Sequence, residues 1–473
     1  MNRRNFLTLS SVTTLWLLTG CGGGKTNSSD INIDNSQNNK LMIPPLLEGV
    51  LKNGIRHYDL SIQESVHNFF KEYDTKTFAI DGSYLGPTIR LINGEDVSLN
   101  YSNKLKENTT IHGHGMHVPA SMDGAAHQVI EPNTIWSAKY TVNQEASSNW
   151  YHPHLMGKTA EHVYKGLAGF IYIEDEEINA LDLPKTYGVD DIPLVLQDRF
   201  FDAEGQLDYS PSRREIMHGY HGDVFIANGT VDAYIDIEAK EVRFRILNGS
   251  NSTVYDLSFT DGRTFKQIAT DNSLLEAPVE LSMVKLSPAE RAEIVVDFSD
   301  DLGNSIELKD NAQNKIFLKI NVINSANSVT KVPDRLKTLE FFSLSDAKNT
   351  RKFTLSGSRG ELFINNKQMS MMRIDERVPL NSIETWEVTN EMGMDHNFHI
   401  HATHFTLAER NGSYENVADN EKGYKDTVYL APNDTVKLLV KMVDFTDNSL
   451  PYMYHCHFLE HEDAGMMGQF TVE

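Results

Sequence analysis

The sequence predicts an all-β fold built from several sandwich or barrel domains. Apolar residues alternate or run in short blocks of strand length, as in Val242–Ile246 and Phe170–Ile173, and turn signals such as Asn93-Gly94 separate these blocks. Short, regularly spaced strands without long helical periodicity are typical of sandwiches and barrels. The 473 residues leave room for about three domains, at roughly 150 residues per domain.

The composition excludes several classes of protein. Lys and Arg total 43 against 66 Asp and Glu, and the resulting net charge of −23 leaves no electrostatic footprint for nucleic acid. The two cysteines, Cys21 and Cys456, are too few for a disulfide scaffold or a thiolate zinc cluster. The hydrophobic fraction of 40% is ordinary for a globular protein, whereas 18 histidines and 16 methionines beside two cysteines need an explanation.

The first residues predict an exported protein. Arg3 and Arg4 precede an apolar stretch that ends at Leu18 and is shorter than the roughly 20 residues of a membrane-spanning helix. This start resembles a twin-arginine signal, and Leu-Thr-Gly-Cys, ending at Cys21, resembles a lipoprotein cleavage box; an ordinary secretory signal is the alternative. We expect a signal peptide over residues 1–20, a lipidated Cys21 with a flexible tether over residues 21–44, and a lipid-anchored location in the periplasm or cell envelope.

Four His-x-His pairs reveal two similar parts of the chain. Each part holds a His-x-His-x-x-His run, a later His-x-His pair, and then Gly-x-x-Gly followed by a strand. These motifs are His112–His117, His152-Pro-His154 and Gly166–Gly169 in the first part, and His399–His404, His455-Cys-His457 and Gly465–Gly468 in the last. We therefore expect domains over residues 45–180, 181–340 and 341–473, and no metal site in the middle one, which has no His-x-His pair.

Each His-x-His pair has a physical consequence if it lies on a strand. Residues i and i+2 point to the same face, so each pair directs two imidazoles into one space. Eight imidazoles exceed the needs of one four-coordinate ion, and we expect a metal cluster. Imidazole suits zinc, copper, iron and nickel, so the pairs alone leave the metal open.

The C-terminal segment indicates copper. In His455-Cys456-His457 the thiol should face away from the two imidazoles. His461 follows Cys456 by five residues and Met466 by ten, while His396 stands three residues before His399. Two imidazoles, a thiolate and a thioether form the ligand set of a blue, electron-transfer copper. The alternative for Met466 is a core methionine.

These motifs resemble the four copper-binding motifs of the multicopper oxidases, and the resemblance covers the chain from about Leu51 to Glu473. The match is closest to the bacterial three-domain group of copper-efflux oxidases and laccase-like enzymes. It implies three cupredoxin-like Greek-key β-sandwich domains and four coppers per chain. The implied ligands are His396, Cys456, His461 and Met466 for type 1 copper, His112 and His399 for type 2, and His114, His152, His154, His401, His455 and His457 for type 3.

The same resemblance implies an activity. An oxidase of this family takes single electrons from a donor at type 1 copper and reduces O2 to water at the other three, with Cys456 joined to His455 and His457 along the chain. Asp123 and Glu462 are implied in proton delivery; the alternatives are surface carboxylates or partners of imidazole N–H groups. We expect O2 and a one-electron donor as the partners, and a monomer.

The donor is less well defined by the sequence. The stretch from Ser325 to Leu362, where copper-efflux oxidases carry a methionine-rich lid, has no methionine, so we expect an open type 1 edge that favours phenols or aromatic amines. Met392 and Met394, just before His396, are candidates for a substrate Cu(I) site or for packing. Two other functions stay open: a silent interaction protein, like the cell-division relative with degraded copper ligands, and a copper-binding protein without turnover.

Two groups of residues receive no role from the motifs. The first is the methionine cluster at Met369, Met371 and Met372. The second is the set of eight histidines that we expect in loops or in the interior: His57, His67, His117, His127, His162, His218, His221 and His404. His117 and His404 occupy equivalent places in the two similar parts.

Overall fold

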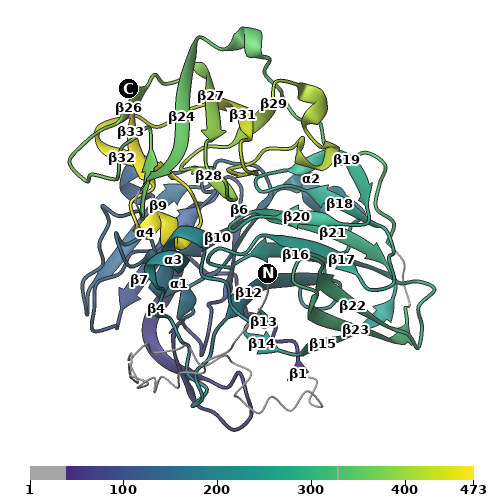
Figure 1. The fold of residues 1–473 in the computed structure, drawn as a ribbon. Coiled ribbons are helices and arrows are strands. Elements are labelled where there is room, and N and C mark those ends of the chain that lie inside the picture. Colours follow the sequence, from purple (N-terminus) through teal and green to yellow (C-terminus); the bar gives the residue numbers. More distant parts are fainter. Residues whose placement is uncertain (1–38, 327–329, 359) are drawn as a thin grey trace, which may run out of the picture.

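A computed structural model describes residues 39–326, 330–358 and 360–473. Within these ranges the strands form six sheets, packed face to face in three pairs (Figure 1), which confirms the predicted all-β class. The predicted signal, the Cys21 lipidation site and most of the predicted tether lie outside the described residues. Among those described, no helix is long and apolar enough to cross a membrane.

The first sheet pair is formed by the N-terminal third of the chain. One sheet contains β3 (Val50–Lys52), β4 (Ile55–His67), β5 (Thr75–Ile80), β7 (Asp96–Asn103) and β9 (Ile135–Thr141). The other contains β2 (Leu46–Leu47), β6 (Thr88–Ile92), β8 (His112–His114), β10 (Ser147–His152) and β11 (Gly169–Glu174). Residues such as Leu60, Ile62 and Ile171 fill the space between the two sheets.

The middle sheet pair has the larger sheets. One sheet contains β12 (Asp191–Arg199), β13 (Val224–Ala227), β14 (Thr230–Val231), β16 (Glu241–Asn248), β18 (Phe265–Ala269), β19 (Leu274–Leu281) and β21 (Arg291–Asp297). The other contains β1 (Asn39–Lys40), β15 (Ala233–Ala239), β17 (Tyr255–Phe259), β20 (Val284–Leu286), β22 (Ser305–Asp310) and β23 (Lys315–Ser325). Because β1 pairs with β15 and Leu41 is buried in this core, the packed part of the chain begins before the predicted end of the tether at residue 44.

The third sheet pair is formed by the C-terminal part of the chain. One sheet contains β24 (Asn349–Ser358), β25 (Glu361–Ile364), β27 (Ile383–Asn390), β29 (Phe405–Arg410) and β31 (Thr435–Lys441). The other contains β26 (Glu376–Val378), β28 (His396–Ile400), β30 (Thr427–Leu430), β32 (Asp447–His455) and β33 (Met467–Val472). Trp386 and Phe398 lie at the centre of its core.

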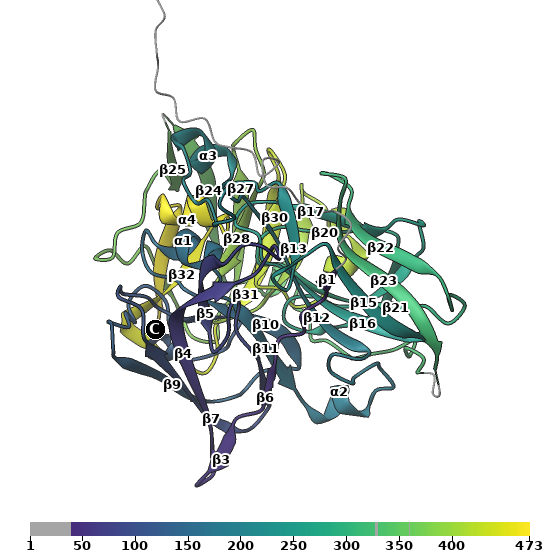
Figure 2. The ribbon, with the colours of Figure 1, turned by 90° about the horizontal axis from the view of Figure 1, so that it is seen from below.

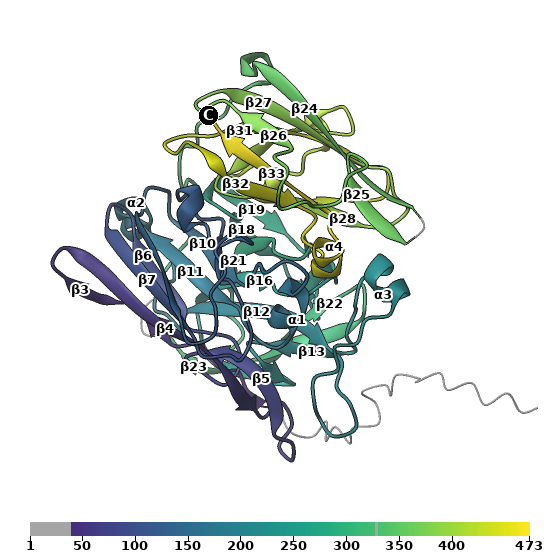
Figure 3. The ribbon, with the colours of Figure 1, turned by 90° about the vertical axis from the view of Figure 1, so that its left-hand side faces the viewer.

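The three sheet pairs meet along shared surfaces. Trp150 and Tyr172 of the first pair share a core cluster with Val195 and Leu247 of the middle pair. Four short helices lie in connections between strands: α1 (Thr159–Tyr164), α2 (Glu176–Ala180), α3 (Arg213–His218) and α4 (Leu459–Asp463). α1 and α3 both pack against α4, so one helix from each sheet pair meets at this junction (Figures 2 and 3).

Packing requires the second glycine of the repeated Gly-x-x-Gly motif, for the same reason in both parts of the chain. Gly169 on β11 lies opposite Tyr151 on β10, and Gly468 on β33 lies opposite Tyr454 on β32. In each pair the tyrosine ring crosses over the glycine, and a Cβ atom there would overlap the ring and its hydroxyl. Glycine is therefore required at both positions next to the strands that carry the later His-x-His pairs.

We predict that Gly468→Ala lowers the free energy of unfolding by about 1–3 kcal/mol, the usual range for overpacking a filled core. Gly393→Ala is the matched control because nothing lies within 4 Å of its Cβ position. Urea denaturation of the two variants measures the difference. Equal stability of Gly468→Ala and Gly393→Ala would show that Tyr454 moves aside without cost.

Candidate metal centres

Strand pairing brings the four His-x-His pairs together. On β8 and β10, His112 lies opposite His152, and on β28 and β32, His399 lies opposite His455. The eight imidazoles come from the first and third sheet pairs and form one cluster at their junction; all eight residues are at most 1% exposed. We call this group the histidine cluster: His112, His114, His152, His154, His399, His401, His455 and His457.

A second group forms around the buried thiol of Cys456. The Nδ1 atom of His396 lies 3.4 Å from Cys456 Sγ, and the Nδ1 atom of His461 lies 3.7 Å from it. The two Nδ1 atoms are 3.2 Å apart, so three donor atoms converge on one small space. Met466 is fully buried beside them, and its backbone carbonyl accepts a hydrogen bond from the Cys456 N–H. We call these four residues the thiolate group.

Asn397 lies between the thiolate group and the histidine cluster and was not predicted from the sequence. Its Oδ1 accepts a hydrogen bond from the backbone N–H of His457 at 2.6 Å and lies 3.6 Å from Cys456 Sγ. Its Nδ2 donates to Ser287 Oγ and to the carbonyl of Pro288 in the middle sheet pair. Asn397 therefore fixes the turn at Cys456, in which the thiol faces the thiolate group and the two neighbouring histidines face the histidine cluster. The sequence signal for this role was its position between His396 and Phe398 on β28.

The histidine cluster divides into three sets by the nitrogens that face one another. His154 Nε2 and His401 Nε2 lie 3.1 and 3.2 Å from His455 Nε2. In a second set, His114 Nδ1 and His457 Nε2 each lie 3.4 Å from His152 Nε2. His112 and His399 form the third set, stacked on His401 and His114 with ring centroids 4.0 and 3.8 Å apart.

The ring nitrogens that turn outward are held by oxygen atoms. His112 Nδ1 donates to the backbone carbonyl of Asp123, and His399 Nδ1 donates to that of Asp426, at 2.8 and 2.9 Å. His152 and His455 likewise donate from Nδ1 to carbonyls of Pro153 and Cys456, respectively. A proton fixed on the outer nitrogen leaves a lone pair on the inner one, as a metal ligand requires.

The inner nitrogens and their charge state fit a bound metal. His112 Nε2 and His399 Nε2 are buried and have no hydrogen-bond partner among the described residues, which is costly unless an ion uses their lone pairs. Burial and then the neighbouring imidazoles lower the pKa of His112 and His401 well below the ordinary value, and burial lowers that of His154 to about 4. Neutral imidazoles beside a buried thiol suit a copper ion.

Asp123 lies at the edge of the histidine cluster. Its Oδ2 accepts a hydrogen bond from His401 Nδ1 at 2.8 Å, while its Oδ1, buried and without a hydrogen-bond partner, lies 3.5 Å from His112 Nδ1. Burial raises the pKa of this carboxyl. Gly124 follows with a φ of +73°, and a Cβ atom there would overlap the carbonyl of Ile111, so only glycine lets this loop approach β8.

Glu462, on α4, also lies at the edge of the histidine cluster. Its two carboxyl oxygens lie 3.4 Å from His154 Nδ1 and from His455 Nδ1, and neither has a hydrogen-bond partner among the described residues. The residue is fully buried, and burial raises its pKa well above the ordinary value. Burial thus favours the protonated form of the Glu462 carboxyl, next to two imidazoles.

Asp426 is a third carboxylate at the cluster, and the sequence analysis missed it. Its Oδ1 accepts a hydrogen bond from His114 Nε2 at 2.9 Å, and its backbone carbonyl accepts the one from His399. Burial would raise its pKa, but Arg291 and His114 hold it well below the ordinary value. No sequence motif around residue 426 signals this role, because its partners come from β8, β28 and β21.

The expected open edge at the thiolate group is wrong. His461 is fully buried, and its outer Nε2 is covered although no methionine-rich segment lies over it. The cover is α3 of the middle sheet pair: Met217 packs against the core that contains Phe458 and Met466 (Figures 2 and 3). Burial lowers the pKa of His461 to about 3, against a smaller raising effect of the Met217 backbone carbonyl.

The candidate substrate methionines lie on the other side of the thiolate group. Met392 Sδ is 3.1 Å from His396 Nε2, and Met394 packs at the edge of the same core. Met369 and Met371 pack against Met453 and two alanines near Asp123, whereas Met372 is 94% exposed. Met392 therefore contacts a residue of the thiolate group directly.

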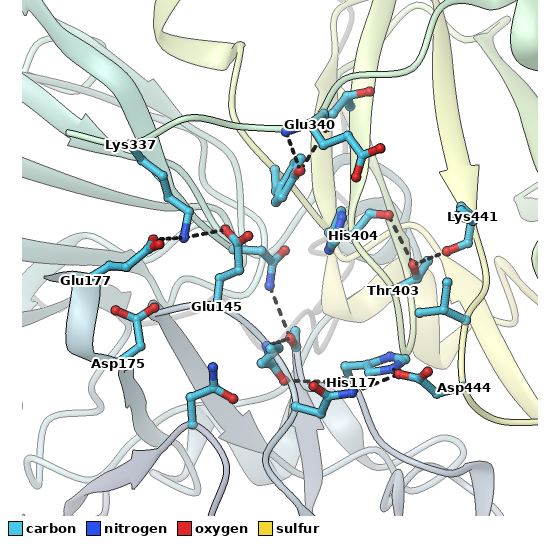
Figure 4. Close-up of a pocket in the computed structure, with 18 of the residues that line it drawn as sticks. His117, Glu145, Asp175, Glu177, Lys337, Glu340, Thr403, His404, Lys441 and Asp444 are labelled. Atoms are coloured by element: carbon cyan, nitrogen blue, oxygen red, sulfur yellow. Dashed lines mark hydrogen bonds and ion pairs between the residues drawn. The ribbon is translucent and has the colours of Figure 1, made fainter. Parts of the chain in front are cut away.

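None of the eight remaining histidines belongs to a candidate metal group among the described residues. His117 and His404, the equivalent pair, both line a cavity of about 840 Å³ where the three sheet pairs meet (Figure 4). His117 Nδ1 lies 2.9 Å from the carbonyl oxygen of Ala402 and its Nε2 lies 2.9 Å from Asp444 Oδ2, while His404 stacks on Tyr424. Nine of the ten other histidines, all except His457, account with Cys456 for the close groups of three imidazole or thiol ligands among the described residues.

Comparisons with known proteins agree with this geometry. Family models described as multicopper oxidase match residues 61–178 and 336–473. The multicopper oxidase mco of Staphylococcus haemolyticus is 36% identical over 439 residues, which cover 92% of each chain. The cell division protein FtsP of Xenorhabdus nematophila is 34% identical, over 93% of this chain and 94% of its own.

A solved structure extends the likeness to three dimensions. The laccase-like multi-copper oxidase CueO of an Ochrobactrum species superposes with a TM-score of 0.85 at 35% identity, over 92% of this chain and all of its own. The resemblance inferred from the four histidine motifs, and with it the cupredoxin-like fold, is confirmed. The chain belongs to the multicopper oxidase family.

Proposed function

We propose that this protein oxidises a one-electron donor at the thiolate group and reduces O2 to water at the histidine cluster. The observation that carries the proposal is the complete and mutually oriented donor set. Nine histidines and one cysteine converge in buried groups, and a tenth histidine, His457, lies 3.4 Å from His152. Two inner nitrogens, His112 Nε2 and His399 Nε2, have no hydrogen-bond partner among the described residues.

In this proposal the thiolate group of His396, Cys456, His461 and Met466 holds type 1 copper. His112 and His399 hold type 2 copper, and the sets His114, His152, His457 and His154, His401, His455 each hold one type 3 copper. The convergence of Nδ1 atoms on Cys456 Sγ, and of mostly Nε2 atoms within each histidine set, supports this division.

Bound copper would supply the electron acceptor beside Cys456 and the four-electron chemistry of O2 reduction at the histidine cluster. The chain supplies the connection between the two groups, since Cys456 is bonded directly to His455 and His457. Burial raises the pKa of the free thiol to about 12, so this thiol becomes an electron-carrying thiolate only when a cation replaces its proton.

Two carboxyl groups are placed to manage protons. Glu462 lies 3.4 Å from the outer nitrogens of His154 and His455, and burial favours its protonated form, while Asp123 accepts the N–H of His401. These contacts with imidazoles of the cluster support a role for both residues in proton delivery to reduced oxygen.

The donor we propose is a phenol or aromatic amine, with Cu(I) as the second candidate. The oxidase activity of the Ochrobactrum enzyme towards lignin model compounds and lignosulfonate supports the first class. The thioether of Met392 beside His396 supports the second, because soft sulfur ligands select Cu(I). Lipid anchoring at Cys21 in the cell envelope remains part of the proposal.

The likeness to FtsP makes an interaction protein without turnover the alternative function, and copper binding without turnover is the other. The interaction alternative does not need the ligand geometry found here, whereas copper binding without turnover differs from the proposal only in the absence of O2 uptake. A binding surface could persist with the histidines replaced, whereas each of these imidazoles is buried and most have an oriented outer nitrogen.

We predict that the copper-loaded protein consumes O2 with a substituted phenol, Cu(I) or Fe(II), at one O2 per four donor electrons. Cys456→Ser removes the thiolate that connects the donor to the histidine cluster. We expect O2 uptake to fall at least about 100-fold, which corresponds to a rise of about 2.7 kcal/mol in the activation free energy. An oxygen electrode measures both proteins with all three donors. Unchanged uptake by Cys456→Ser contradicts the proposed path, and no uptake by the copper-loaded parent protein favours the alternatives.

We predict that Glu462→Gln lowers kcat for O2 reduction about 100-fold, because the amide keeps the shape of the protonated carboxyl but cannot release a proton. Glu460→Gln is the matched control: Glu460 is equally buried on α4 but bonds to Ser252 and Asn251, away from the cluster. Steady-state uptake and the visible absorption of the thiolate group are measured for both. A similar loss of kcat in both variants would mean that activity depends on any buried carboxyl of α4 and not on proton release from Glu462.

A further inference from the structure

The middle sheet pair contains no candidate metal group among its described residues, yet one of its side chains reaches the histidine cluster. Arg291 is the first residue of β21, and its side chain is fully buried. Its guanidinium forms a two-pronged pair with Asp426 of the third sheet pair: Nη1 to Oδ1 at 2.7 Å and Nη2 to Oδ2 at 2.6 Å. Such fork-shaped pairing fixes the carboxylate plane as well as its charge.

The same guanidinium also holds the first sheet pair. Arg291 Nε donates to the carbonyl of Ser148 at 2.9 Å, and Nη2 donates to Asn149 Oδ1 at 3.3 Å. Both residues lie on β10, which ends at the cluster residue His152. The Arg291 side chain, from the middle sheet pair, therefore bonds both to β10 of the first pair and to Asp426 of the third pair.

Asp426 passes this constraint to two imidazoles. Its carboxylate accepts the Nε2–H of His114, which leaves the Nδ1 lone pair of His114 facing His152. Its backbone carbonyl accepts the Nδ1–H of His399, which leaves the unpartnered Nε2 facing His112 and the cluster. Asp426 thus selects the inward nitrogen on one histidine from each similar part of the chain.

The packing leaves no other position for these groups. Gly115, next to His114, has a φ of +79°, and a Cβ atom there would lie 2.6 Å from Asp426 Oδ2 and 2.8 Å from Arg291 Nη2. The backbone N–H of Arg291 donates to Asp271 Oδ1, and Lys425 Nζ lies 3.1 Å from Asp271 Oδ2. The Asp426 carboxylate is therefore held by an ionic network without access to water.

We propose that Arg291 is a positioning residue that, through Asp426, sets the inward nitrogens of His114 and His399, so that the middle sheet pair assembles a metal cluster to which it contributes no ligand. This inference rests on the proposed copper function of the cluster. It assigns a role to a part of the chain whose sequence carries no metal motif.

The test compares Arg291→Lys and Arg291→Met with Arg245→Lys in the copper-loaded protein. Arg245 is the matched control because it forms an equally buried two-pronged pair, with Asp191 at 2.8 and 2.7 Å, without touching a cluster ligand. Copper per chain is measured after dialysis against a competing chelator. Electron paramagnetic resonance reports the type 2 signal, and visible absorption reports the thiolate group.

We expect both Arg291 variants to bind copper in the histidine cluster about 10- to 100-fold more weakly, the usual effect of removing a partner that orients ligands. The type 2 signal should change while the thiolate absorption stays as in the parent protein, and Arg245→Lys should match the parent in both. Arg291→Lys retains the charge and serves as the variant that folds if Arg291→Met does not.

Parental copper content and an unchanged type 2 signal in Arg291→Lys would overturn the positioning role. An equal loss in Arg245→Lys would overturn it as well, because the effect would then belong to any buried ion pair. Absence of cluster copper in the parent protein itself would instead overturn the proposed function, and that result is visible before any variant is made.

Discussion

The structure depends on one constraint: imidazoles buried at the junction of the sheet pairs must each keep a lone pair directed inward. Oxygen atoms around the cluster meet this constraint, because each accepts a hydrogen bond from an outer ring nitrogen and so fixes the proton there. Main-chain carbonyls hold His112, His152, His399 and His455, while carboxylates hold His114 and His401. Burial lowers the pKa of His112, His114, His152, His401 and His455 and so favours their neutral forms, which leaves their inner nitrogens to an ion.

This constraint explains the three-part architecture. Two similar sheet pairs each supply four imidazoles from strand edges, and neither could surround the cluster alone. The middle pair supplies side chains that fasten the others: Arg291 bonds to β10 and Asp426, Asn251 and Ser252 bond to Glu460 on α4, and α3 covers His461. These contacts close the junction around the histidine cluster and the thiolate group.

Much of the site could be predicted from the sequence because it follows from local geometry. The two-residue period of a strand places His112 and His114 on one face of β8, whereas the second histidine of each other pair lies just beyond the end of β10, β28 or β32. The alternation still holds at Cys456, whose thiol faces the thiolate group while its two neighbours face the histidine cluster. The all-β fold likewise follows from short apolar blocks and turn pairs.

The rest depends on contacts between segments far apart in the chain. His114 and Asp426 are 312 residues apart, and Arg291 and Asp426 are 135 apart. Such pairs leave no local pattern, so Asp426, Asn397 and Arg291 were missed. The cover over His461 was missed for a similar reason: it comes from α3 in the middle sheet pair, whereas the expectation considered the segment from Ser325 to Leu362.

The central claim is that these buried groups hold four coppers, and anomalous X-ray diffraction at the copper edge from crystals of the copper-loaded protein tests it most directly. The account predicts four peaks per chain. One should lie among His396, Cys456, His461 and Met466, and three should lie among the eight imidazoles of the histidine cluster. A single peak in the histidine cluster, or no peak beside Cys456, would contradict it.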